Sequence, residues 1–235
     1  MPKNTIITIV SGSGLLKKVN LKGFRGFTLA EVLITLVIIG VIAAMTIPTL
    51  MNNTNNQEYV SRLKKAYSTL AQATKLLIAE NGPVSGWGLT KDEAGYQKLM
   101  DMYGKVLQRA QICSGSGCFS SDMYTNLDGT DYKRLDTDTR WASLPKFILS
   151  DGTLILFDSS LSSDCTGSFG GVKFCAEIFV DINGKKKPNR WGRDLYEFLL
   201  TDNGLALSGC NQSCDTSTTG YHCACKVLRE GAMNY

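Results

Sequence analysis

The chain has 235 residues, of which 43% are hydrophobic, with 25 basic residues, 21 acidic residues and one histidine. The sequence holds no Gly-x-Ser-x-Gly elbow and no His-Glu-x-x-His motif, which argues against a hydrolase of either class, and we expect no enzyme. The formal net charge of +4 gives little support for nucleic-acid binding, because five basic residues precede residue 27 and the other 20 nearly balance the acids.

Residues 1–26 form a basic N-terminal segment that contains no acid. Its apolar run, Thr5 to Val10, is too short to span a bilayer. An excess of positive charge before an apolar segment holds that end on the cytoplasmic side, so the C-terminal part is expected to face outward. The charges are carried by Lys3, Lys17, Lys18, Lys22 and Arg25.

Residues 27–51 form an apolar run in which Glu31 is the one ionisable residue. A nearly uncharged run of about 18 residues or more is long enough to cross a bilayer as a helix. The run is followed by Asn-rich sequence rather than by an Ala-x-Ala pattern, so we expect a retained anchor and not an ordinary signal peptide. An ionised carboxylate inside the run costs roughly 2.5–3.5 kcal/mol unless it is paired, so Glu31 needs a partner.

The sequence Gly26-Phe27-Thr28-Leu29-Ala30-Glu31 resembles the processing site of type IV prepilins and type II secretion pseudopilins, and Leu33 to Leu50 resembles the helix that follows it. The resemblance implies that a prepilin peptidase cuts after Gly26 and methylates Phe27, giving N-methylphenylalanine. It also implies that Glu31 pairs with the terminal amine of a neighbouring subunit during assembly, where an opposite charge replaces lost solvation.

The implied function is that of a structural subunit, a minor pilin or pseudopilin, of a type IV pilus-like or type II secretion filament. The expected partners are other pilin or pseudopilin subunits, the prepilin peptidase and an inner-membrane assembly platform. The protein would cross the cytoplasmic membrane once, with its C-terminal domain outside, and then enter an extracellular or periplasmic filament. A DNA-uptake pilin and a simple membrane-anchored extracytoplasmic binding protein remain as alternatives.

Residues 52–235 are expected to form one exported head domain. Apolar residues at the 3.6-residue period predict an amphipathic helix over 56–81, which ends at Asn81-Gly82-Pro83, and a second helix over 91–111. Pro48 is compatible with a kink or a break in the preceding helix. Residues 113–139 are rich in Ser, Gly, Asp and Thr, which predicts an irregular surface loop.

Strand patterns begin at Lys146 and predict a sheet within about 146–228. Residues 146–158 are expected to form a hairpin around Asp151-Gly152, and residues 176–182 a further strand. Residues 194–209 are expected to form a second hairpin around the Asp202-Asn203-Gly204 turn. Four or five antiparallel strands would cover the long helix, which gives an α+β fold. The resemblance implies the same architecture, a long N-terminal helix laid on an antiparallel sheet, as in type IV pilins.

Eight cysteines all lie on the exported side, and an even number in an exported domain predicts disulfides. We expect short bridges within the first two pairs and pairing of the last four among themselves. Zinc held by Cys210, Cys214, Cys223, Cys225 and His222 is the alternative, but Cys-x-Cys fits the usual ligand spacing poorly. The cysteines are Cys113, Cys118, Cys165, Cys175, Cys210, Cys214, Cys223 and Cys225.

The stretch 181–194 could hold Ca²⁺ through oxygens of Asp181, Asn183, Asn189 and Asp194, as some pseudopilins hold calcium. Three consecutive lysines and two arginines in the same stretch would repel a cation, so we favour a polar turn in which Asx side chains bond the backbone, and no cofactor. The same bases could contact nucleic acid beside Trp191, but a solvated charged turn is the favoured interpretation.

Overall fold

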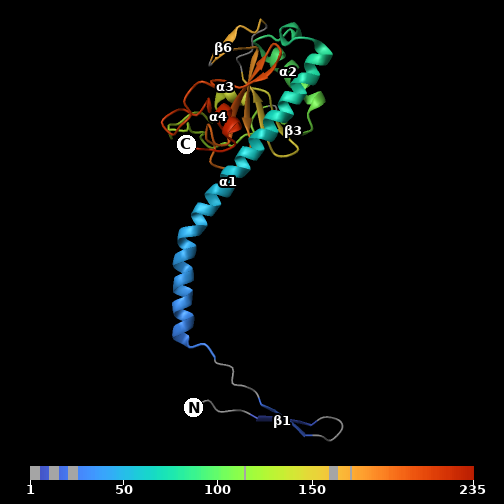
Figure 1. The fold of residues 1–235 in the computed structure, drawn as a ribbon. Helices are drawn as coiled ribbons and strands as arrows, with labels where there is room; N and C mark the ends of the chain where they lie inside the picture. The colour runs from blue at the N-terminus through green and yellow to red at the C-terminus, as the bar shows by residue number, and fades with distance from the viewer. Residues whose placement is uncertain (1–5, 11–15, 21–25, 114, 159–163, 170) are drawn as a thin grey trace. The chain divides into compact units, whose positions relative to one another are not determined.

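The computed structural model describes residues 6–10, 16–20, 26–113, 115–158, 164–169 and 171–235. The chain divides into two compact units, residues 1–52 and residues 53–235, which we describe separately (Figure 1). In the first unit, β1 (Ile6–Val10) pairs with β2 (Leu16–Asn20) in an antiparallel hairpin. Three of the five bases of the N-terminal segment, Lys3, Lys22 and Arg25, lie outside the described residues.

The helix α1 runs without interruption from Leu29 to Asn81 and belongs to both units. It passes through Pro48, where the sequence was compatible with a kink or a break, and through the Asn-rich residues 52–56. Asparagine is only a moderately poor helix former, and 52–56 contains neither Gly nor Pro, so the backbone hydrogen bonds continue. The predicted end is confirmed: Gly82 takes the left-handed conformation with φ of 78°, and its N–H bonds to the Ile78 carbonyl at 2.9 Å.

The head contains a six-stranded antiparallel sheet in the order β10-β9-β8-β5-β4-β3. The two predicted hairpins are present, and Gly152, with φ of 88°, lies in the turn of the first. The hairpin β6–β7 is inserted between β5 and β8, which are neighbours in the sheet. The strands are β3 (Arg109–Cys113), β4 (Lys146–Leu149), β5 (Leu154–Phe157), β6 (Gly167–Phe169), β7 (Val172–Phe174), β8 (Ala176–Asp181), β9 (Leu195–Thr201) and β10 (Gly204–Ala206).

The remaining helices differ from the predicted bounds. A 3-10 turn, η1 (Val84–Trp87), follows α1, and α2 (Glu93–Val106) is shorter than the predicted 91–111 because the chain beyond it becomes the edge strand β3. The sheet ends at Ala206, so the predicted limit near residue 228 is wrong: residues 223–230 form the helix α4 (Cys223–Glu230). A short helix, α3 (Thr139–Ala142), begins at the last residue of the predicted loop.

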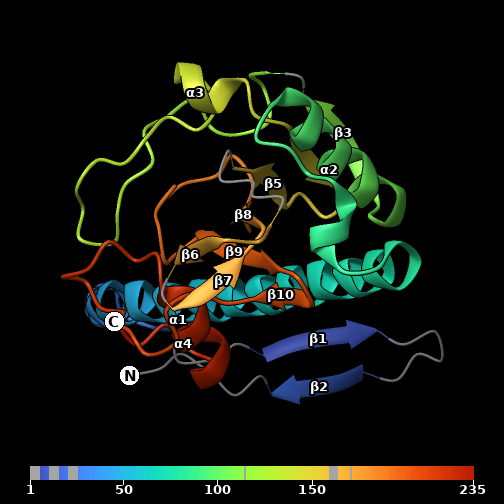
Figure 2. The ribbon, with the colours of Figure 1, turned by 90° about the horizontal axis from the view of Figure 1, so that it is seen from above.

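The two faces of the sheet carry two separate cores, since side chains alternate along each strand. Ile178 and Val180 of β8 pack with the α1 side chains Leu63 and Leu70, while Phe179 packs on the opposite face. Figure 2 shows α1 along one side of the sheet and the loop bearing α3 on the other. The long loop between β3 and β4 therefore covers the second core.

Lys146 and Asp136 hold this covering loop in place, although both side chains are buried. The Lys146 Nζ donates to the carbonyls of Gly115 and Ala142, each at 3.0 Å. The Asp136 carboxylate accepts the backbone N–H groups of three successive residues at 2.8–3.1 Å. Burial lowers the pKa of Lys146, and the nearby Asp136 carboxylate opposes that shift. The N–H donors belong to residues 117, 118 and 119.

Candidate processing and assembly site

The candidate site lies where irregular chain becomes the first turn of α1. Gly26, Phe27 and Thr28 precede the helix, and the Phe27 side chain is 87% exposed. A Cβ placed on Gly26 would meet no atom within 4 Å, and Gly26 has no positive φ. The packing of this chain therefore gives no reason for glycine at position 26.

Glu31 bonds to Thr28 in the same chain. The Thr28 backbone N–H and hydroxyl both donate to Glu31 Oε2 at 2.8 Å, and the Glu31 backbone N–H donates back to Thr28 Oγ1 at 3.2 Å. This reciprocal arrangement is a capping box, which satisfies two N–H groups that the start of a helix leaves without partners. Sequence reasoning singled out Glu31 and missed Thr28, although Thr-x-x-Glu before an apolar run is the signature of a capping box.

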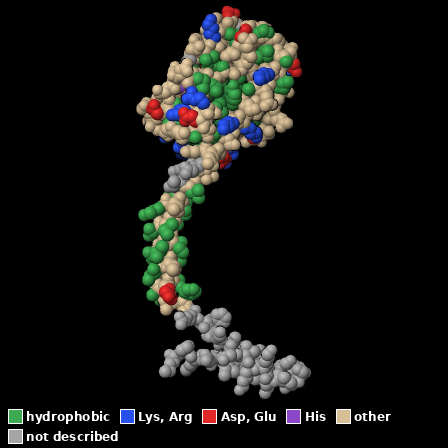
Figure 3. Space-filling view, viewed as in Figure 1, with side chains coloured by type: hydrophobic (Ala, Val, Ile, Leu, Met, Phe, Trp, Pro, Cys, Tyr) green, Lys and Arg blue, Asp and Glu red, His purple; other side chains and the backbone are tan. Residues whose placement is uncertain are grey.

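The rest of this end of α1 presents apolar side chains outward, as Figure 3 shows along the helix. Residues Leu29–Pro48 have a mean hydropathy of 2.5, and none of this segment is buried. Side chains on all sides of the helix are exposed, including Leu33 at 54%, Val37 at 65% and Met45 at 73%. A helix that is apolar all round requires a membrane or a protein partner. The segment thus anchors the chain in a membrane and leaves the C-terminal domain exposed.

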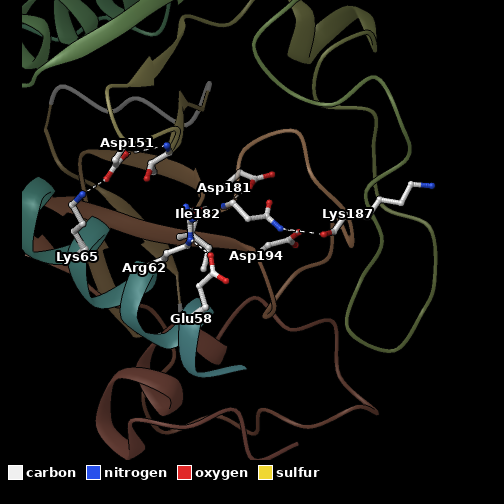
Figure 4. Close-up of polar contacts among 10 residues, drawn as sticks. Glu58, Arg62, Lys65, Asp151, Asp181, Ile182, Lys187 and Asp194 are labelled. Carbon is white, nitrogen blue, oxygen red and sulfur yellow. Dashed lines mark hydrogen bonds and ion pairs between the residues drawn. The ribbon is translucent and has the colours of Figure 1, made fainter. Parts of the chain in front are cut away.

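The four residues weighed as calcium ligands do come together between β8 and β9, as their hydrogen bonds show. Figure 4 labels the two carboxylates, Asp181 and Asp194. Asp194 Oδ2 accepts the Asn189 N–H at 2.8 Å and the Asn183 side-chain N–H at 3.0 Å. Asp181 accepts the Tyr124 hydroxyl at 2.7 Å and the Asn183 N–H at 3.1 Å. Both carboxylates are completely buried.

These bonds fit calcium poorly. Calcium would require oxygens directed at one point, whereas the carboxylates already accept protein N–H and O–H groups and Asn183 turns its amide nitrogen to Asp194. The Oδ1 atoms of Asn183 and Asn189 have no hydrogen-bond partner. A calcium ion that used them together with the two carboxylates would compete with the N–H groups that these carboxylates already accept. The geometry agrees better with a hydrogen-bonded polar turn.

Burial raises the pKa of Asp194 to about 6, against the effect of its hydrogen bonds. Burial, and next the Asp194 carboxylate, raise the pKa of Asp181 well above its ordinary value. Two buried carboxylates in one turn therefore favour the protonated state more than exposed aspartates do.

The bases of the same turn hold neighbouring segments of the head. Lys185 Nζ donates to the Gly117 carbonyl at 2.5 Å, and Lys187 lies 3.7 Å from the Asp122 carboxylate. The two arginines also have partners within the head: Arg190 donates to Thr125 Oγ1 at 3.3 Å and Arg193 donates to Asn56 Oδ1 at 3.0 Å. Four of the five basic side chains are thus engaged within the protein, which weakens the case for a phosphate-binding patch.

All eight cysteines lie in the described part of the chain and form four disulfides: Cys113–Cys118, Cys165–Cys175, Cys210–Cys225 and Cys214–Cys223. No described cysteine is free to hold zinc in this state. His222 Nδ1 lies 3.5 Å from Ser208 Oγ, which lies 3.4 Å from Glu197 Oε2. In a hydrolase triad the imidazole stands between the nucleophile and the acid, whereas here the buried serine stands between the other two groups.

Two family models match this chain, one at its N-terminal apolar segment and one over most of the remainder. Residues 21–47 match the prokaryotic N-terminal methylation motif, which marks a type IV pilin-like protein, and such proteins assemble with other pilin subunits after processing by a prepilin peptidase. No significant match was found among curated proteins or among solved structures. Residues 49–206, more than half of the chain, match the model of a family of unknown function, and the chain therefore belongs to that family, DUF6613.

Proposed function

We propose that this protein is a minor structural subunit of a type IV pilus-like or type II secretion filament. In this proposal the peptide bond after Gly26 is cut, Phe27 is methylated, and the subunit enters the filament through the apolar part of α1. The observation that carries the proposal is the exposed apolar segment Leu29–Pro48, which overlaps the methylation motif and holds a single acid, Glu31, in its first turn.

The contacts of Glu31 suggest how assembly would use this acid. In the unprocessed chain, the carboxylate bonds to Thr28, two residues after Gly26. Cleavage would place a cationic amine on Phe27, next to Thr28, and a neighbouring subunit would bring such an amine to Glu31 in the apolar layer. An opposite charge offsets the desolvation of a buried carboxylate better than neutral donors do. Assembly would then favour one axial register.

Cleavage is tested by mapping the N-terminus of the membrane protein from cells with an active prepilin peptidase. Wild type should begin at N-methylated Phe27, and Gly26→Glu should retain residues 1–26. The matched control is Gly23→Glu, which adds the same charge three residues upstream and should be processed normally. A wild-type protein that still begins at Met1 would refute the processing step.

Assembly is tested with Glu31→Leu and Glu31→Gln, measured as the protein recovered in sheared filaments at equal expression. Breaking one side of a buried ion pair typically costs about 3–5 kcal/mol, so both variants should be almost absent from filaments while cleavage after Gly26 continues. Glu58→Gln is the matched control, because Glu58 lies on the same helix and pairs with Arg62 of its own chain at 2.8 Å. Wild-type incorporation of Glu31→Leu would show that the carboxylate is not the assembly contact.

The filament system is identified by deleting the gene and measuring secretion, motility and transformation in parallel. Loss of secretion assigns the subunit to a secretion pseudopilus, and loss of motility assigns it to a pilus. Loss of transformation alone would favour the DNA-uptake alternative. In that case, binding of DNA by the head should depend on Lys186, the member of the basic turn for which the structure gives no polar contact.

A further inference from the structure

The four disulfides are of two kinds when they are considered in chain order. The bridges Cys113–Cys118 and Cys165–Cys175 each join cysteines that are consecutive along the chain. The last two bridges are nested, because Cys210–Cys225 encloses Cys214–Cys223. A nested pair cannot be made by joining each cysteine to the next one along the chain.

Simple oxidation favours a different product at this end of the chain. Cys210 and Cys214 are four positions apart, whereas the native partners are separated by 15 and 9 positions. Closing a shorter loop costs less conformational entropy. In a chain exported N-terminus first, these two thiols also reach the oxidising side before the other two. Oxidation alone therefore favours a bridge between Cys210 and Cys214.

The folded head does not accept that product. Cys223 and Cys225 would be left to pair, but both lie in α4, where residues at positions i and i+2 do not face each other. The inner bridge is also part of the core: Cys214 is 4% exposed and Cys223 is completely buried, in the same cluster as Val227 and Val60. The non-native bridge must consequently be opened before α4 packs against the head.

We infer that this protein is a substrate of a thiol–disulfide isomerase in the compartment that receives the head, in addition to a disulfide-donating oxidase. The isomerase thiolate attacks Cys210 in the Cys210–Cys214 bridge and forms a mixed disulfide, which releases Cys214 as a thiolate. The Cys225 thiolate then attacks Cys210 in the mixed disulfide, so that Cys210–Cys225 forms and the isomerase thiolate is released. No net electrons are transferred in this exchange.

The inner bridge forms by oxidation. The thiols of Cys214 and Cys223 transfer two electrons and two protons to the disulfide of the donor, which becomes a dithiol. The donor therefore accepts two electrons when Cys210–Cys214 first forms and two more when Cys214–Cys223 forms. The isomerase changes which sulfurs are joined and consumes no oxidant.

The test is refolding of the reduced full-length chain in detergent micelles with a disulfide donor alone or with a dithiol isomerase added. The linkages are mapped by mass spectrometry of peptides kept unreduced. With the donor alone, we expect the Cys210–Cys214 linkage in most molecules, and with the isomerase at least a fivefold gain in molecules that hold both native bridges. With the donor removed, the isomerase should convert molecules trapped with Cys210–Cys214 to Cys210–Cys225 without a change in intact mass, because exchange alone transfers no net electrons.

Two double variants provide matched controls. Cys210→Ser with Cys225→Ser removes the outer bridge, and Cys214→Ser with Cys223→Ser removes the inner one. In each variant the three remaining native bridges join consecutive cysteines, so each should reach its native linkages with the donor alone and gain nothing from the isomerase. The inference is overturned if wild type acquires all four bridges equally well without the isomerase, or if both variants depend on it as strongly as wild type.

Discussion

At the scale of single residues, the capping box at the start of α1 depends on one hydroxyl group. Thr28→Val keeps the shape of the side chain and removes the Oγ1 atom that accepts the Glu31 N–H at 3.2 Å. Loss of an N-terminal cap typically costs about 1 kcal/mol. We expect amide exchange over residues 29–32 to become roughly fivefold faster in detergent micelles, measured by NMR, since about 1 kcal/mol corresponds to that factor.

The control for this prediction is Thr35→Val, seven residues or about two turns further along the chain. The Thr35 hydroxyl donates to the Val32 carbonyl at 2.9 Å, a bond that does not cap the helix start. Its removal should leave exchange over residues 29–32 unchanged. Equal exchange in both variants would mean that the capping box does not stabilise the first turn.

Asp194 makes the free energy of unfolding of the head decrease as the pH rises, which is the opposite of the effect of a carboxylate stabilised by an ion pair. Its pKa is raised by burial to about 6, so the folded state binds a proton that the unfolded state releases near pH 4. The stabilising contribution is complete below the unfolded pKa and is lost as the pH rises through 6. Two pKa units correspond to about 3 kcal/mol, so wild type should lose more stability between pH 4.5 and 7.5 than Asp194→Asn does.

Denaturant unfolding of both proteins over this pH range measures the difference in slope. Comparing slopes cancels shared groups that Asp194 does not influence, including His222, whose pKa is lowered by burial and whose contribution has the opposite sign. Asp181 does not cancel, because the Asp194 carboxylate raises its pKa, and its contribution to the difference has the same sign as that of Asp194. Identical slopes would show that Asp194 does not take up a proton on folding.

At the scale of elements, one buried lysine connects the edge of the sheet to the loop that covers it. Lys146→Met fills much of the same volume but leaves the carbonyls of Gly115 and Ala142 without the donor they share. Hydrogen bonds to charged groups contribute about 1.5–3 kcal/mol each. We expect the free energy of unfolding to fall by about 3 kcal/mol, because the two bonds share one desolvated donor.

Lys173→Met is the matched control, because Lys173 is an exposed lysine in the short strand β7. Chemical denaturation should find this variant within about 0.5 kcal/mol of wild type. If Lys146→Met is equally mild, the loop is held by the Asp136 contacts and by the Cys113–Cys118 bridge rather than by the ammonium group.

At the scale of the whole molecule, the head holds a core of its own, although α1 is shared by both units. A chain that begins at Asn53 keeps the α1 side chains from Val60 to Leu77 that pack on the sheet. We expect residues 53–235 to be a folded, water-soluble monomer with cooperative thermal unfolding, measured by circular dichroism and size-exclusion chromatography.

A second truncation tests whether the boundary is set by this core. A chain that begins at Ala66 lacks Val60 and Leu63, which are 5% and 0% exposed in the head. Loss of two buried aliphatic side chains costs on the order of 2–5 kcal/mol each, so this chain should melt far below the first or fail to fold. Aggregation of the longer chain would mean that the head needs the membrane unit.

The sequence by itself determined the features that depend on local composition. The apolar run of residues 27–51 predicts a membrane helix, since its length and near lack of charge are properties of neighbouring residues. The end of α1 at Gly82 and the turn at Gly152 follow from backbone conformations that glycine adopts readily. The even number of cysteines after the apolar run predicted disulfides, because such a run places them in an oxidising compartment.

Only the tertiary structure decided features that depend on partners distant in sequence. Residues 109–111 lie at the end of the helix predicted over 91–111, yet they belong to the edge strand β3, because β4 offers backbone hydrogen-bond partners. Asp136 and Lys146 look like surface residues in the sequence, and their burial depends on the loop that folds over them. The nested pairing of the last four cysteines likewise follows from the packing of α4, because spacing alone favours the shorter loop.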